Sequence, residues 1–262
     1  MNRTREPHLE VTDLRKDFEG LMAVYDVSFR VGHGEIVSLI GPNGAGKTTI
    51  FNLISGVLSS TGGTIRYDGR ELSGLRPHQI SVLGLARTFQ TVRLFGNMTV
   101  LENVMVGRHA RTRYGVLSTA FRLPPARSAE RLIRDQAMRQ LARVGLETKA
   151  DDNALSLPFG QQRLLEMARA LATDPRMLLL DEAGSGLNRT EKEELGRLIR
   201  SIRADGVTVL VVEHDIPFVM GLSDRVIVLE HGVKIADGTP AEIQSDARVI
   251  AAYLGEDIQN LC

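Results

Sequence analysis

The 262-residue sequence contains no tryptophan and a single cysteine, Cys262, which is its last residue. One thiol excludes an intrachain disulfide and any metal site built from several thiolates, and it fits a reducing compartment. Lysine plus arginine equals aspartate plus glutamate at 32 each. Because the chain has no excess positive charge, we do not expect nucleic acid as a partner.

Long apolar runs are also missing from the sequence. The first ten residues lack the apolar centre of a secretory signal, and no later stretch reaches the roughly 18 to 20 apolar residues of a spanning helix. We therefore expect no transmembrane segment. With 43% hydrophobic residues, however, the chain has enough apolar side chains to bury a sizeable core in one domain spanning residues 1–262.

The most informative stretch is a glycine-rich loop at residues 41–48, which follows the apolar run 35–40 and precedes a helical pattern over residues 49–57. Glycines let the backbone bend around an anion, and successive N–H groups at a helix start point at phosphates. Lys47 reaches the outer phosphates and the Thr48 hydroxyl suits Mg²⁺. The predicted nucleotide-binding residues are Gly41, Pro42, Asn43, Gly44, Ala45, Gly46, Lys47, Thr48 and Thr49.

A second motif is the apolar run 177–180, which ends in the two carboxylates Asp181 and Glu182. A buried strand lying beside the phosphate loop would place Asp181 near the metal ion and Glu182 near the terminal phosphate. A buried strand that merely reaches a polar loop is the alternative. The presence of the phosphate loop in the same chain favours the functional interpretation.

Between these motifs, residues 157–161 read Leu-Pro-Phe-Gly-Gln and lead into a helical segment over residues 164–173. With this element the chain resembles the ATP-binding cassette (ABC) family over about residues 9–254. The further matches are Gln90 as the glutamine loop, residues 185–188 as the D-loop, His214 as the switch histidine and Phe18 as the aromatic residue that stacks on adenine.

The resemblance and the strand pattern together predict an α/β fold. It has a P-loop NTPase (RecA-like) core sheet, an antiparallel β patch and an inserted helical signature subdomain. The core lobe is expected over about residues 1–92 and 174–262, and the helical subdomain over about 93–173. Core or patch strands are expected at residues 24–31, 36–40, 177–180, 207–212 and 226–229, with a turn near 65–69.

The chemistry that the resemblance implies is ATP hydrolysis by in-line attack of water on the γ-phosphate. Glu182 polarises the water, His214 senses the γ-phosphate, and Gln90 contacts both Mg²⁺ and the water. Thr48, Gln90 and Asp181 form the metal site. A lone histidine is more often structural than catalytic, but the place of His214 after an apolar strand and in motif order favours a functional role.

Two such subunits are expected to pair head to tail, with Phe159, Gly160 and Gln161 of one covering the ATP of the other. Here Pro158 replaces the signature serine and Phe159 a small glycine. Proline is tolerated at a first helical position, and the N–H groups of Gly160 and Gln161 remain available to an anion. Ala183 and Asn188 also depart from the pattern, and either change could alter communication between the two sites.

Within this family the chain looks most similar to the ATPase subunits of branched-chain amino acid importers, from its Phe-Gly-Gln-Gln signature and residues 87–95, 98–104 and 249–255. The implied partners are membrane permease subunits, a second ATPase subunit that is identical or homologous, and indirectly a solute-binding protein. The implied location is the cytoplasmic side of the inner or plasma membrane. Open alternatives are transport of urea or another amino acid or amide, lipid export, a non-transport ABC ATPase and a small-molecule kinase.

One stretch is notably basic, and its residues are Arg108, Arg111, Arg113, Arg122, Arg127, Arg131 and Arg134. We favour a solvated helix face and loop over contact with anionic lipid or a membrane partner.

Overall fold

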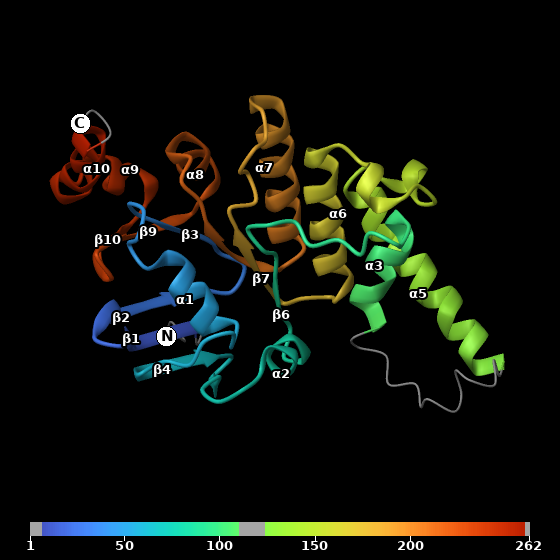
Figure 1. Ribbon diagram of the computed structural model, residues 1–262, viewed down its shortest axis with the longest axis horizontal. Coiled ribbons are helices and arrows are strands. Elements are labelled where there is room, and N and C mark those ends of the chain that lie inside the picture. Colours follow the sequence, from blue (N-terminus) through green and yellow to red (C-terminus); the bar gives the residue numbers. More distant parts are fainter. Residues whose placement is uncertain (1–6, 110–123, 260–262) are drawn as a thin grey trace, which may run out of the picture.

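The computed structural model describes residues 7–109 and 124–259, without the side chains of residues 109, 124–129 and 254–259. Three arginines of the basic stretch, Arg111, Arg113 and Arg122, therefore lie outside the described residues, as does the side chain of Arg127. The described chain forms two sheets, with further helices gathered to one side of them (Figure 1).

The larger sheet has the strand order β10-β9-β3-β8-β7-β6. Its neighbouring pairs from β9 to β6 are parallel, and only β10 runs antiparallel, at the edge. Parallel strands covered on both faces read as continuous apolar runs, which is why the sequence reveals them. Their bounds are β3 Ile36–Ile40, β6 Leu85–Arg87, β7 Met177–Asp181, β8 Thr208–Val212, β9 Arg225–Glu230 and β10 Val233–Gly238.

Each core strand divides its side chains between two apolar clusters, because successive residues point to opposite faces. In β7, Met177 and Leu179 pack toward α1 (Lys47–Ile54) and the second sheet. Leu178 and Leu180 pack toward α7 (Arg189–Ala204) on the other face. The sheet is thus the middle layer of the core.

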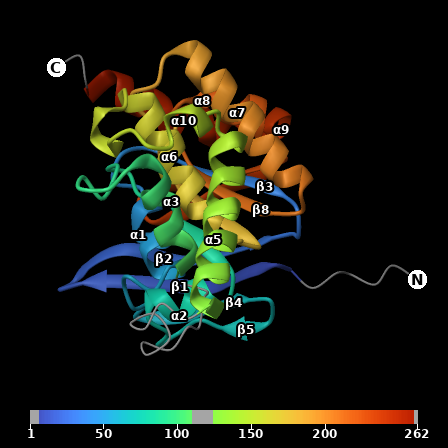
Figure 2. The same cartoon turned by 90° about the vertical axis from the view of Figure 1, so that its right-hand side faces the viewer.

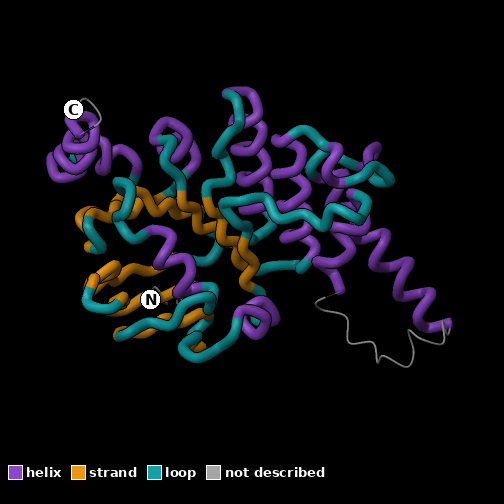
Figure 3. The backbone as a smooth tube through the Cα atoms, viewed as in Figure 1, coloured by secondary structure: helices purple, strands orange, loops and turns teal. Residues whose placement is uncertain are grey.

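The second sheet is antiparallel, as predicted, with the order β2-β1-β4-β5. Its strands are β1 Leu9–Phe18, β2 Leu21–Val31, β4 Gly62–Tyr67 and β5 Arg70–Glu71. Helix α1 lies between the two sheets (Figure 3), where Ile50 and Phe51 are fully buried. It begins at Lys47 and ends at Ile54 rather than covering residues 49–57, because the last of these residues form a turn.

The helices that lie to one side of the two sheets pack on one another around an apolar cluster that includes Val104, Leu141 and Leu165 (Figure 2). They are α3 Val100–His109, α5 Pro124–Arg143 and α6 Phe159–Ala172, and α2 Pro77–Val82 precedes them in the chain. Helix α6 starts five residues before the predicted segment 164–173. The helical period of apolar residues begins only at Leu164, so this period does not indicate the first turn of α6, which begins at Phe159.

Three further described α-helices, α8 Ile216–Leu222, α9 Pro240–Ser245 and α10 Ala247–Gln259, cover the β9–β10 end of the core sheet. Two short 3-10 helices, η1 Glu147–Lys149 and η2 Ala154–Ser156, lie between α5 and α6. Among the described residues, no helix combines the length and the apolar character needed to cross a bilayer.

His8 joins the two sheets from a buried position, where its side chain is 2% exposed. Its Nδ1 lies 2.6 Å from Thr208 Oγ1 and its Nε2 lies 3.1 Å from Tyr67 Oη. The ring stacks on His33 with centroids 4.1 Å apart. Burial lowers the pKa of His8 from 6.5 to about 4, against the opposing charge of Asp68. His8 is therefore a neutral structural histidine near neutral pH.

Candidate functional site

The predicted site residues gather where four neighbouring parallel strands end at the same edge of the core sheet. The phosphate loop follows β3, His214 follows β8, Asp181 ends β7 and Gln90 follows β6. In the register, Leu39 lies opposite Val212, and Val212 lies opposite Asp181. This is the edge where α/β sheets bind their ligands.

One detail differs from the expectation that the strand of Asp181 lies beside the phosphate loop. Strand β8 is inserted between β3 and β7, so Asp181 is two strands away from the loop's own strand. Arg87 bridges Asp181 and the helix after the phosphate loop, because it donates both to Asn52 of α1 and to Asp181. The Asp181 carboxylate is thereby tied to the helix that follows the phosphate loop.

The phosphate loop depends on two glycines where the chain approaches other backbone closely. A Cβ on Gly41 would lie 2.1 Å from the carbonyl oxygen of Leu229. A Cβ on Gly46, at φ +95°, would lie 2.6 Å from that of Ala23. The Lys47 ammonium donates to the carbonyls of Gly41 at 2.6 Å and Pro42 at 2.8 Å, which holds the loop curved.

The amino end of α1 is suited to an anion. The N–H groups of Lys47, Thr48 and Thr49 belong to the first turn and have no intrahelical acceptor. No side chain caps the helix and no acidic residue occupies its first turn. The positive end of the helix dipole therefore faces the loop interior. Thr48 is exposed there, within reach of a ligand.

Asp181 is 2% exposed, and its Oδ2 accepts from Arg87 Nη2 at 2.8 Å. Its Oδ1 is buried without a hydrogen-bond partner among the described residues. Burial raises the pKa of Asp181, while the Arg87 guanidinium opposes that shift. A carboxylate oxygen without a hydrogen-bond partner, at the strand end where the phosphate loop also lies, is the kind of oxygen ligand that Mg²⁺ takes, so the residues fit that ion.

Glu182 occupies a left-handed backbone conformation, with φ +49°. Its N–H donates to the Val212 carbonyl at 2.9 Å, which fixes the residue against the end of β8. Its Oε2 accepts from the Gln90 amide Nε2 at 2.9 Å. The strained backbone turns the carboxylate toward Gln90, and strain of this kind is common at functional sites.

His214 lies exposed in the loop after β8. The residue before it, Glu213, was not predicted from the sequence, but it contacts the segment that carries Glu182. Glu213 is 1% exposed, and its Oε1 accepts from the Gly184 N–H at 2.6 Å. Burial raises the pKa of Glu213. This buried carboxylate shapes the turn after Glu182. The sequence did contain a signal for Glu213, because its carboxylate directly follows the apolar strand β8.

Phe18 ends β1 with 40% of its side chain exposed, and the Lys16 ammonium lies 4.8 Å from its ring centroid. The hairpin that carries it reaches the phosphate loop, since Ala23 of β2 is the backbone that Gly46 approaches. Phe18 is thus a partly exposed aromatic ring on the element beside the loop.

The signature residues are not brought to the phosphate loop of the same chain, because α6 lies on the far side of β7 from α1 (Figure 1). Pro158 is the N-cap of α6 and not its first residue, which is Phe159. Phe159 is 48% exposed. Gln161 accepts from Lys149 at 2.7 Å.

The D-loop lies against this turn. A Cβ on Gly186 would lie 2.8 Å from the Phe159 ring, and one on Gly160 would lie 2.6 Å from a Glu191 carboxylate oxygen. Asn188 caps α7, accepting from the Glu191 N–H at 3.0 Å while its own N–H donates back. The asparagine thus has a local role that any good N-cap residue can fill.

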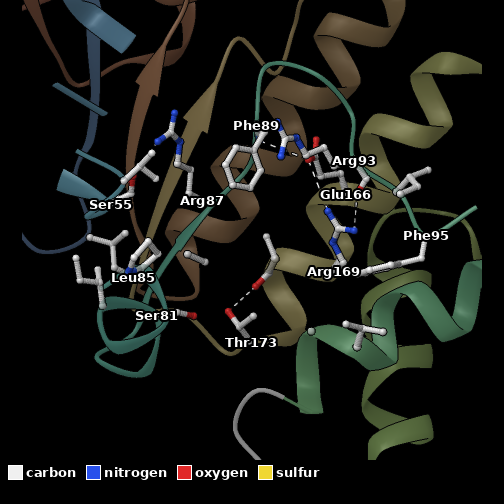
Figure 4. A pocket seen from close by; sticks show the side chains of 18 residues that line it. Ser55, Ser81, Leu85, Arg87, Phe89, Arg93, Phe95, Glu166, Arg169 and Thr173 are labelled. Carbon is white, nitrogen blue, oxygen red and sulfur yellow. Dashed lines mark hydrogen bonds and ion pairs between the residues drawn. The ribbon is translucent and has the colours of Figure 1, made fainter. Parts of the chain in front are cut away.

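A cavity of about 500 Å³ lies beside the segment that carries Gln90 (Figure 4). Its walls come from α2, β6, α3 and α6, and Phe89 and Phe95 face it. Its lining contains no residue of the phosphate loop, so it is separate from the anion site.

His8, His33 and Asp68 are a second group that could be considered for a metal ion. The two imidazole planes lie only 16° apart in a stack. An ion held by both rings has to lie near both ring planes, which a parallel stack prevents. We interpret this group as packing.

The fold and this site define a phosphate-loop nucleoside triphosphatase. A family model described as ABC transporter matches residues 24–185, and one described as branched-chain amino acid ATP-binding cassette transporter matches residues 233–258. The chain belongs to the ABC transporter family and is one of its ATP-binding cassettes, which confirms the resemblance and the predicted fold class.

Relatives at several levels agree with this assignment. The chain is 46% identical over 251 residues to the high-affinity branched-chain amino acid transport ATP-binding protein BraF of Pseudomonas aeruginosa, covering 95% of this chain and 98% of that protein. It is 30% identical to an ATP-binding cassette solved in its ADP conformation, with a TM-score of 0.83 and coverage of 95% and 99%. It is 26% identical to a bacterial ABC transporter cassette solved as a dimer, with a TM-score of 0.76 and coverage of 88% and 98%.

Proposed function

We propose that this chain is the ATP-hydrolysing subunit of a branched-chain amino acid importer, and that it works as one half of a head-to-tail ATPase pair on the cytoplasmic side of the membrane. The observation that carries the ATPase role is the meeting of the phosphate loop, Asp181, Glu182 and Gln90 at one sheet edge. The substrate class rests on BraF and on the family match at residues 233–258.

In this proposal the phosphate loop, residues 41–49, binds the phosphates through its N–H groups and Lys47. Thr48, Asp181 and Gln90 hold Mg²⁺, which neutralises negative charge on the phosphates when it is bound. Phe18 stacks on the adenine. Preorganised donors and positioning supply most of the catalysis, because little covalent chemistry is required of the protein.

The residues that act on water are Glu182 and Gln90. The Glu182 carboxylate accepts a proton from the attacking water, and the Gln90 amide, which already donates to that carboxylate, fixes its direction. His214 contacts the γ-phosphate. The kinase alternative offers no role for His214 or for the signature turn.

The pairing assigns Phe159, Gly160 and Gln161 to the ATP held by the second ATPase subunit, identical or homologous. Two observations support this assignment. These three residues lie away from the phosphate loop of their own chain, and the first-turn N–H groups of α6 have no intrahelical acceptor and can bind an anion from another subunit. The helical subdomain then spans about residues 93–173 and the core lobe about 1–92 and 174–262. Permease subunits, and through them a solute-binding protein, complete the complex.

The test compares purified wild type with Glu182→Gln by size-exclusion chromatography in ATP while phosphate release is recorded. The variant should lose turnover and accumulate as an ATP-bound dimer, because it binds ATP but does not split it. Failure of wild type to hydrolyse ATP, with neither protein dimerising, would contradict self-pairing.

Uptake of leucine, isoleucine and valine in cells that lack this chain tests the solute class. Loss of that uptake, restored by wild type and not by Glu182→Gln, is the expected result. Loss of urea uptake alone would point to the rival substrate.

A further inference from the structure

The segment that carries Gln90 is held by the signature helix. Residues 88–94, here called the glutamine loop, leave β6 and have no regular secondary structure. Arg163 of α6 donates from Nη1 to the Phe89 carbonyl at 3.0 Å and from Nη2 to the Gln90 carbonyl at 2.5 Å. The guanidinium thus binds two successive carbonyls through two N–H groups of a rigid, planar fork, which the single ammonium of a shorter lysine does not reproduce.

Two further residues of α6 fasten the same loop. Glu166 accepts from the Phe89 N–H at 3.4 Å, and Arg169 donates to the Arg93 carbonyl at 2.5 Å. Figure 4 shows Glu166 and Arg169 extending from α6 toward Phe89 and Arg93. Because residues three apart lie on one side of a helix, Arg163, Glu166 and Arg169 present a single charged face to the loop.

Two of the three residues of this face are buried, and Arg169 is partly buried. Arg163 is 9% exposed and Glu166 is 2% exposed. Burial raises the pKa of Glu166, and the two flanking arginines act against that shift. Charged groups are kept in such a place only when they are paired and hydrogen-bonded, so the loop backbone and the helix face stabilise each other.

Gln90 is therefore held at both ends. Its carbonyl is bound by Arg163, and its side-chain amide donates to Glu182 at 2.9 Å. Arg163 lies about one helical turn after Phe159, the first residue of α6. Arg163 therefore connects the amino end of α6 to the residue that contacts Glu182.

We propose that Arg163 is a positioning residue for ATP hydrolysis, which acts through the Gln90 carbonyl and makes the direction of the Gln90 amide depend on the position of the signature helix. The proposal rests on the proposed ATPase function. It adds to that function a hydrogen-bonded link, within one chain, between the signature helix and the water-activating carboxylate.

The test is a double-mutant cycle in the full chain with Arg163→Lys and Gln90→Ala. Arg163→Lys keeps the charge beside Glu166 and removes the fork. We expect kcat to fall about tenfold with the KM for ATP within about twofold of wild type. In the Gln90→Ala background, Arg163→Lys should lower kcat no further, because its effect passes through Gln90.

Arg169→Lys is the matched control, since it makes the same change on the same helix but contacts the loop at Arg93. Its effect should add to that of Gln90→Ala. Additive behaviour of Arg163→Lys would overturn the proposal. If Arg163→Lys does not fold, the double variant Arg163→Gln/Glu166→Gln removes both buried charges and enters the same cycle.

Hydrogen–deuterium exchange over residues 88–94 is an independent measurement. We expect faster exchange in Arg163→Lys than in wild type, and unchanged exchange would overturn the proposal. If wild type hydrolyses no ATP, the proposed function fails while this exchange measurement still decides whether Arg163 holds the loop.

Discussion

Arg87 and Asp181 form a buried ion pair, in which Arg87 Nη2 donates to Asp181 Oδ2 at 2.8 Å and the two side chains are 8% and 2% exposed. The same guanidinium donates to Asn52 in α1, the helix that follows the phosphate loop, and to Ser55, the C-cap of that helix. One arginine therefore holds the Asp181 carboxylate next to helix α1.

Arg87→Met should lower the free energy of unfolding by about 3 kcal/mol at neutral pH, because it leaves the Asp181 carboxylate buried without its cation. The pKa of Asp181, which burial already raises, rises further without Arg87. The folded variant then binds a proton more tightly than the unfolded chain, so part of the lost stability returns as pH falls. Urea unfolding at several pH values measures this. Arg66→Met, at an exposed arginine of β4, should change stability by less than about 0.5 kcal/mol.

Gly46→Ala should abolish ATP binding and destabilise the protein, because the new Cβ meets the Ala23 carbonyl in addition to the strain at φ +95°. Gly44→Ala is the matched control in the same loop. Gly44 has φ +79° but open space around its Cβ, so only the backbone strain of about 1 kcal/mol remains. Titration with a fluorescent ATP analogue and thermal unfolding distinguish the two variants. Equal losses would mean that the contact with β2 is not important.

Phe18→Trp should report nucleotide binding directly, because the chain has no tryptophan of its own. Stacking on adenine should quench the emission on addition of ATP, while Phe18→Ala should weaken ATP binding about tenfold, as expected for loss of one stacking contact. Leu21→Trp, on the same hairpin at a position 73% exposed, is the control and should not respond. An equal response at both positions would count against the adenine contact.

The stability of the protein should fall between pH 6.5 and about 4 because of His8. Burial lowers the pKa of His8 to about 4, so over this window the unfolded chain binds a proton that the folded protein excludes. The loss amounts to at most about 3 kcal/mol and ends below the folded pKa. Urea unfolding at several pH values should show this slope in wild type and a shallower one in His8→Gln. His78→Gln, at an exposed histidine of α2, is the control for the loss of one histidine. The same slope in His8→Gln as in wild type would contradict the assignment.

The parts of this protein that depend on local interactions could be predicted from its sequence. A glycine-rich turn, a lysine and a helix start are adjacent in the chain, so residues 41–49 were recognisable without the fold. Strands buried on both faces are apolar throughout, so β3, β7 and β8 were predicted to within one residue at either end. The motif order was enough to identify the family.

Features that depend on residues far apart in the chain became visible only in the fold. The insertion of β8 between β3 and β7 is a matter of strand pairing, which no local pattern encodes. The first turn of α6 was missed because its residues follow no apolar period, and Glu213 was missed because only the fold shows that it accepts from Gly184. No role was predicted for Arg163, because only the fold buries it against the glutamine loop and makes the Phe89 and Gln90 carbonyls its acceptors.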